Sequence, residues 1–266
     1  MKKIYISIFV LITIGLISCD KYERYFCRSY VYSYNSYNDI ELKNIDSTNF
    51  LNESFVGLEE IFLKNIDSVN VVAIVATNIK EICNMHSKGK QAIIYDSLCV
   101  LHKDMSYNRK ERSLDSPIWS GAHFALSPDL ANINIISDMD FDEFHKAGDK
   151  LNDIINLLSF STAPFIRSGY VSLYHADTSN SEYYYYAILS LSRNRAFPIK
   201  KSLSEITISD MELMGGGFNW YLEHNTPIAY LFFTQEPTIS KTHNLTVTIT
   251  LSDGRFFEKN IEKTFN

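Results

Sequence analysis

Four aspartates between residues 138 and 149 have a spacing that could bind a divalent cation. Asp138, Asp140 and Asp142 occupy alternate positions and Asp149 is twelfth counting from Asp138, as in a calcium-binding loop. Carboxylates crowded this closely repel one another unless a cation or a helix N-terminus offsets their charge. The sixth position, however, is Glu143, where such loops need glycine, and the twelfth is Asp, where Glu is usual. We therefore favour a polar turn over a calcium site, and expect no other cofactor.

Catalytic motifs are missing from the sequence. The chain contains no G-x-S-x-G elbow, no H-E-x-x-H, no phosphate-binding Walker loop and no G-x-G-x-x-G. Catalytic triads are assembled in space, so His123, His145 and His175 remain candidates for a triad that the sequence does not reveal. We expect no enzymatic activity, with a hydrolase kept as an alternative.

The first nineteen residues have the pattern of an export signal. A basic start at residues 1–3 and an apolar run over 4–15 are followed directly by Leu-Ile-Ser-Cys. A transmembrane helix needs about 20 apolar residues, and this run is shorter. A small residue before a cysteine in this position resembles the bacterial lipobox, in which signal peptidase II cleaves before the cysteine and its thiol receives a diacylglycerol. The sequence therefore predicts a signal peptide over 1–18, cleavage between Ser18 and Cys19, and lipidation of Cys19.

Lipidation would place the protein on a membrane rather than in it. Each buried methylene of an acyl chain contributes about 0.8 kcal/mol, and no second apolar run long enough to span a bilayer follows Cys19. The net charge of −6 over 266 residues argues against a nucleic-acid partner. We expect a lipid-anchored protein of the cell envelope, at the outer membrane on a face that stays open. Its expected partners are the membrane and either an envelope protein or a glycan.

The remaining cysteines leave two interpretations open. With Cys19 lipidated, Cys27, Cys83 and Cys99 form an odd set in a compartment that permits disulfides. A bridge between Cys83 and Cys99 would close a short loop and stabilise the fold by roughly 3 kcal/mol. Buried thiols that pack as small apolar residues are the alternative.

Aromatic residues suggest a second candidate function, glycan binding. Tyrosines crowd residues 19–38, which we interpret as a lipidated tether that joins a sheet edge, and four more follow one another at 183–186. Exposed rings in a row, with Trp119 or Trp220, could stack on sugar faces. Packing in a core is the commoner use of such rings, so a glycan-binding lipoprotein remains an alternative.

Short strands with turns between them dominate the rest of the chain and predict the fold class. Strand patterns fall at residues 30–34, 68–75, 133–136, 169–174, 183–191, 206–208, 228–234 and 245–251, and short helices are expected at 79–86 and 151–158. The last strand leads into Ser-Asp-Gly-Arg, a tight hairpin turn with its partner strand at 256–264. We predict one domain over 39–266, an all-β or β-dominated antiparallel sandwich, immunoglobulin-like or similar, with one or two short helices.

Two segments carry a resemblance to a known family. Residues 133–142 with their Asp-Phe-Asp turn, His145, the Ala-Gly-Asp of 147–149 and the closing hairpin of 245–265 resemble a family of uncharacterised Bacteroidetes lipoproteins. The likeness covers mainly residues 133–266. It implies an envelope location and a β-rich fold, and it implies no reaction and no catalytic residues.

Overall fold

A computed structural model describes residues 29–45, 70–107, 123–170, 197–214 and 227–265. The strands are β1 (Val31–Ser36), β2 (Asp39–Ile45), β3 (Val71–Thr77), β4 (Lys80–Asn84), β5 (His123–Leu126), β6 (Leu130–Ser137), β7 (Ile155–Ser161), β8 (Phe197–Ser202), β9 (Pro227–Phe233), β10 (Thr242–Leu251) and β11 (Phe256–Thr264). Within these residues the helical elements are α4 (Gly89–Leu101), the short 3-10 helix η2 (Asn152–Ile154) and α5 (Ala163–Arg167). The described chain is therefore dominated by strands, as the sequence predicts.

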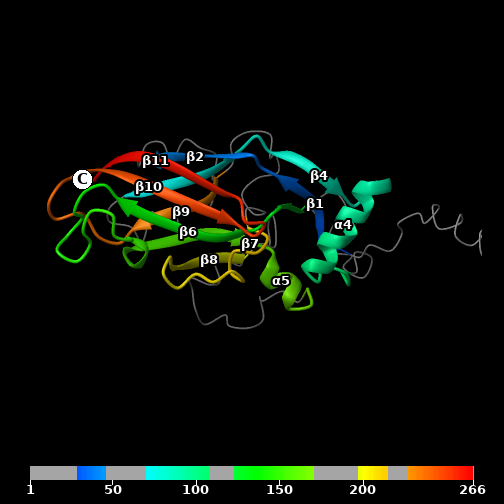
Figure 1. Cartoon of the computed structure of the whole chain (residues 1–266). Helices are drawn as coiled ribbons and strands as arrows, with labels where there is room; N and C mark the ends of the chain where they lie inside the picture. The colour runs from blue at the N-terminus through cyan, green and yellow to red at the C-terminus, as the bar shows by residue number, and fades with distance from the viewer. Residues whose placement is uncertain (1–28, 46–69, 108–122, 171–196, 215–226, 266) are drawn as a thin grey trace, which may run out of the picture.

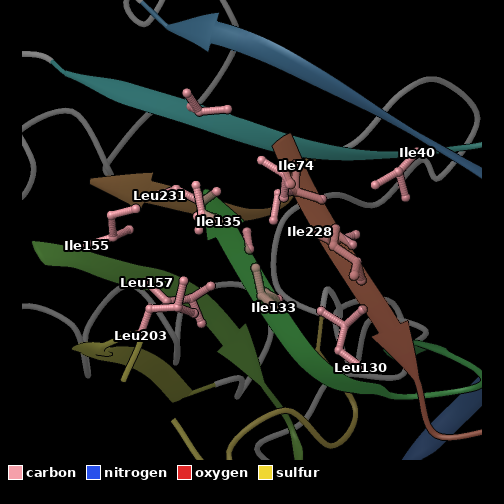
Figure 2. Close-up of a cluster of buried hydrophobic side chains, with 14 of the residues drawn as sticks. Ile40, Ile74, Leu130, Ile133, Ile135, Ile155, Leu157, Leu203, Ile228 and Leu231 are labelled. Carbon is pink, nitrogen blue, oxygen red and sulfur yellow. The ribbon is translucent and has the colours of Figure 1, made fainter. Parts of the chain in front are cut away.

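Two sheets pack face to face and enclose the larger hydrophobic core. One has five strands in the order β2-β3-β9-β7-β8, all antiparallel, and the other has three in the order β11-β10-β6. Figure 2 shows Ile74, Leu157 and Leu231 of the larger sheet pointing towards Ile133 and Ile135 of β6. Each such side chain contributes about 1.5–3 kcal/mol when it is fully buried. The antiparallel sandwich predicted from the sequence is confirmed.

The C-terminal hairpin is the clearest case of sequence pattern becoming structure. In β10 every second residue from Leu245 to Leu251 is buried, while the threonines between them are partly exposed. The turn to β11 has Gly254 at φ +87°, a conformation that glycine adopts without steric cost. The predicted hairpin is confirmed, and its register pairs Thr250 with Phe256.

A smaller sheet with two helices forms a second core at one end of the molecule (Figure 1). Its order is β4-β1-β5, with β1 antiparallel to β4 and parallel to β5. The core beneath it is largely aromatic, and its rings meet edge to face or tilted, the arrangement that aromatic quadrupoles favour. It consists of Tyr30, Val31, Tyr34, Cys83, Tyr95, Cys99, Tyr107, Ala125, Ala163, Phe165, Ile166, Tyr170 and Leu213.

The same chain segments build both cores. β1 continues into β2 and β3 into β4, so one long antiparallel pair bends from the small sheet into the five-stranded sheet. At the bend Asn78 has φ +54°, a conformation that asparagine tolerates better than most residues. β5 likewise leads into β6 after the cis Ser127–Pro128 bond. The two cores are therefore joined by continuous strands.

Several predicted elements differ from those observed. The helix expected at 79–86 is strand β4, and the one expected at 151–158 is η2 followed by strand β7. Residues 206–208 form no strand, and helix α4 and strand β8 were not predicted. Strand pairing overrides the local pattern in β4 and β7, because each has a neighbouring strand to complete. The strand predicted at 183–191 lies outside the described residues.

The boundary of the predicted tether also changes. β1 is the central strand of its sheet, and Tyr30, Tyr34 and Tyr37 are at most 1% exposed. Residues 29–38 therefore belong to the folded domain, which begins no later than Ser29 rather than at residue 39. These three rings cannot form a sugar-stacking strip, because both of their faces are covered by protein.

Candidate functional site

The aspartate-rich segment lies in the connection between β6 and η2. This connection folds back beside β6: Gly148 N donates to the Ser137 carbonyl at 2.8 Å and Leu151 N to the Ile135 carbonyl at 2.9 Å. Gly148 has φ +86°, which allows the reversal. Within the loop Phe141 is fully buried and stacks on Phe233, so it holds the loop on the sandwich. The polar loop predicted here is confirmed in position.

All four predicted ligands accept hydrogen bonds from backbone amides, and three of them accept one such bond each. Asp138 accepts from Asn244 N at 2.9 Å, Asp140 from Ala147 N at 2.9 Å, and Asp149 from Lys146 N at 2.8 Å. Asp140 also pairs with the Lys146 ammonium at 3.2 Å. In each of these bonds a carboxylate oxygen serves as the acceptor for a backbone N–H. Each carboxylate thus fixes a different part of the chain.

The fourth, Asp142, forms the centre of a tighter cluster. Its Oδ1 accepts from Phe144 N at 2.7 Å and His145 N at 2.8 Å, and its Oδ2 accepts from Gln235 Nε2 at 2.7 Å. The His145 ring lies between two carboxylates, with Nδ1 2.9 Å from Asp142 and Nε2 3.1 Å from Asp153. A neutral imidazole can donate through only one nitrogen, so this arrangement favours the imidazolium form.

The electrostatics of this cluster favour the charged pair. Burial lowers the pKa of His145, but the hydrogen bonds to Asp142 and Asp153 outweigh it, and the net pKa is raised. Burial raises the pKa of Asp142, and its bonds from His145 and Phe144 N more than offset this, so that pKa is lowered. Both nitrogens of His145 are engaged, which leaves no lone pair for a general base. The Asp142–His145–Asp153 cluster therefore has a structural role, in which its hydrogen bonds hold the β6–η2 loop closed.

The calcium hypothesis gains no support from this geometry. Among the residues that the structure describes, no three His, Cys, Asp or Glu side chains come together in a way that could hold a metal ion. Asp138, Asp140, Asp142 and Asp149 each accept from backbone donors. The polar-turn interpretation explains all four of them.

A serine and a histidine meet on the neighbouring strands β6 and β10. Ser137 Oγ lies 2.7 Å from His243 Nδ1, and His243 Nε2 lies 2.7 Å from the Ser240 carbonyl. A carbonyl can only accept, so Nε2 carries the hydrogen, and in the neutral ring Nδ1 accepts from the serine. Both residues are only 1% exposed, and Phe141 and Phe265 pack against the imidazole. This pair resembles part of a triad in chemistry, but substrate has no access to it.

A buried histidine and aspartate lie close together where five segments of the chain converge. His102 follows α4 and stacks on Tyr34, and its Nε2 is 3.7 Å from an oxygen of Asp129, which precedes β6. Asp129 Oδ1 accepts from Leu213 N at 2.8 Å, and its carbonyl accepts from Ser252 N in the β10–β11 turn. The pair thus joins the small sheet to the hairpin.

Burial sets the protonation of this pair. Burial raises the pKa of Asp129, the hydrogen bond from Leu213 N lowers it and Glu212 raises it, and the net pKa is about 6. Burial lowers the pKa of His102, against an opposing effect of Glu212. Perturbed pKa values often mark functional sites. Here burial in the packed interior explains both shifts.

The sequence identified some of these residues and missed others. His145 was named as a candidate, and it joins the aspartate loop through hydrogen bonds that its closeness along the chain allowed. His102 and His243 were not singled out, because their partners lie 27 and 106 residues away in the sequence. For His123 the structure describes only the backbone, as part of β5. The other candidates lie outside the described residues: His175, Trp119, Trp220 and Tyr183 to Tyr186.

The cysteines are partly described. Cys83 of β4 and Cys99 of α4 are both buried in the smaller core, and the structure contains no disulfide between them, which was one of the two interpretations. Their burial fits the alternative of thiols that pack as small apolar side chains. Ser18, Cys19 and Cys27 lie outside the described residues.

Comparison of the chain with protein-family models, with curated proteins and with solved structures found no match. In the described part of the chain, none of the helices has the length and apolar character needed to cross a bilayer. The Bacteroidetes lipoprotein resemblance accordingly remains an expectation.

Proposed function

We propose that this protein is a lipid-anchored component of the bacterial cell envelope, at the outer membrane, in which the β-sandwich serves as a binding or structural accessory. The observation that carries this proposal is the sequence Leu-Ile-Ser-Cys directly after the basic start and apolar run of residues 1–15. The resemblance to Bacteroidetes lipoproteins over residues 133–266 agrees with this location.

The structure supports an accessory role through the use of its polar groups. The Asp142–His145–Asp153 cluster closes a loop, and the Ser137–His243 pair is shut off from solvent. Ser29, the tenth residue after Cys19, is already buried in the folded domain, so the proposed anchor and the sandwich are close along the chain. These features fit a compact body displayed close to a membrane.

Mass spectrometry of the protein from its native membranes tests the anchor. We expect a chain that begins at Cys19 and carries the added mass of a diacylglycerol. The Cys19→Ala variant should keep its leader, and Cys27→Ala, the matched control, should be processed as the parent is. An intact leader on the parent chain, or normal processing of Cys19→Ala, would refute the proposal.

The accessory role needs a separate test. Cross-linking in intact cells followed by purification of the tagged protein should recover a specific envelope protein, which a Cys19→Ala chain away from the membrane should not recover. Specific retention of the protein on a polysaccharide gel would instead favour the glycan-binding alternative. Hydrolysis of an ester, peptide or glycoside substrate by the purified protein would contradict the accessory role.

A further inference from the structure

Helix α4 has an apolar face that packs on the fold and another that does not. Tyr95 and Cys99 are buried against β1 and β4. On the outer side Ile93 and Leu101 are each 68% exposed and Val100 is 57% exposed. Residues three, four, seven and eight apart share one face of a helix, so these three side chains form one outer face, which Ile94 widens. Large aliphatic side chains grouped in this way mark an interaction surface.

The position of α4 indicates what covers this face. Ser29, the first described residue, hydrogen-bonds through its hydroxyl to that of Tyr95 in α4, and the Tyr95 hydroxyl donates to the Val31 carbonyl. The helix therefore lies beside the start of β1, at the end of the molecule remote from the C-terminus (Figure 1). Ser29 is the tenth residue after Cys19, and ten steps of fully extended chain span at most about 35 Å. A lipid on Cys19 would hold Ser29, to which Tyr95 of α4 is hydrogen-bonded, within that distance of the bilayer.

The charges around the helix also favour contact with a lipid bilayer. Lys88 and Lys90 at its start and Lys103 just after its end are exposed, against one exposed acidic residue, Asp96. The protein as a whole is acidic, so this basic surrounding departs from the average of the chain. Lysines beside an apolar helix face are typical of helices that lie in the membrane interface, where they meet anionic headgroups.

We propose that the outer face of α4, formed by Ile93, Ile94, Val100 and Leu101, lies on the lipid surface to which Cys19 is anchored. This inference rests on the proposed function, since it needs the anchor to bring the helix to the bilayer. A helix of 13 residues is about 20 Å long, and an interfacial helix sinks about 5–10 Å into the headgroup boundary. The contact fixes the orientation of the sandwich, with the end that carries the aspartate loop away from the membrane.

Quenching of an added tryptophan by brominated lipid tests the contact. Full-length lipidated protein is reconstituted into vesicles of phosphatidylethanolamine and phosphatidylglycerol, with and without brominated acyl chains. Leu101→Trp places the reporter on the outer face. Phe144→Trp is the matched control, because Phe144 is 78% exposed in the loop after β6, at the opposite end of the molecule. The signal of Trp119 and Trp220 is subtracted using the parent chain.

We expect the brominated vesicles to quench roughly half or more of the added emission of Leu101→Trp and little of that of Phe144→Trp, because only a ring sunk about 5–10 Å reaches the bromines. Equal quenching of the two variants would overturn the inference. The inference would also be overturned if Leu101→Trp is not quenched and the protein self-associates in detergent as its concentration rises. That result would assign the outer face of α4 to contact with a second copy of this protein. Flotation of the protein with the vesicles separates the two proposals: without flotation the anchor itself fails, and with flotation but no quenching only the helix contact fails.

Discussion

Replacing the buried Asp129 by Asn is expected to stabilise the protein at neutral pH. The carboxyl has its oxygen 3.7 Å from His102 Nε2, and burial raises its pKa to about 6. An unfolded aspartate has a pKa of about 3.9, so folding shifts the value by about 2 units. Asn keeps an oxygen to accept the bond from Leu213 N and carries no charge to bury.

The size and sign of this effect follow from proton linkage. A raised pKa means that the folded state binds the proton more tightly, so the stabilisation is complete below about pH 4 and is lost as pH rises through about 6. At about 1.4 kcal/mol per unit, a shift of 2 units makes ionised Asp129 cost about 3 kcal/mol above pH 6. The Asn variant should therefore match the parent near pH 4 and exceed it by about 1–3 kcal/mol near pH 8.

Urea unfolding curves of parent and Asp129→Asn across about pH 4 to 8 measure this difference. The midpoint of the variant should move to higher urea as pH rises, with an unchanged slope. His102 does not interfere at the upper end, because burial lowers its pKa and leaves it neutral there. A variant less stable than the parent near pH 8 would show that the carboxylate is paired with a charged histidine, and the reasoning would be wrong.

Three further outcomes are expected. Asp104→Asn should destabilise the protein by about 3 kcal/mol in urea unfolding. In the parent, Asp104 Oδ1 accepts from Tyr30 N and Oδ2 accepts from Val31 N. The asparagine amide has only one oxygen, so in either orientation one of these buried N–H groups faces an NH₂ group. The exposed Glu143→Gln serves as its control, and equal midpoints would contradict the expectation. Lys103→Gly should raise stability by about 0.5–1 kcal/mol, since Lys103 has φ +58°, and a lower melting temperature would count against that strain. The melting temperature should be the same in calcium and in chelator, and a rise in calcium would revive the metal site in the aspartate loop.

The parts of the fold that were predictable are those in which local pattern and tertiary environment agree. β10 and β11 alternate apolar and polar residues around an Asp-Gly turn, and β3 is a continuous apolar run that becomes a fully buried strand. In each case side chains two apart need the same environment, which is the strand period. The sandwich class follows from such segments.

Helix α4 was missed for the opposite reason. Its residues are apolar on the buried face and on the outer face, so the sequence shows no amphipathic period, and Gly89 at its start reads as a stop signal. Its end is a Schellman motif, with Lys103 N bonded to the Val100 carbonyl and Asp104 N to that of Cys99. Glycine usually marks this motif, and lysine in its place gives no signal in the sequence.

The candidate sites were predictable only where their residues are close in sequence. His145 and Asp142 are three apart, and the turn between them brings them together. Ser137 meets His243 only because β6 pairs with β10, and His102 meets Asp129 only because the β5–β6 connection passes the end of α4. Such pairings depend on strand order, which one sequence does not specify.

The central place of β1 has a mechanical consequence. The strand is hydrogen-bonded on both sides, to β4 and to β5. At its start the Asp104 carboxylate accepts hydrogen bonds from Tyr30 N and Val31 N. A pull on the chain ahead of Ser29 therefore acts along the strand and shears both ladders at once, and does not peel off one bond after another. Under such a force the folded domain would be held by strand β1, to which the pulled segment is directly connected.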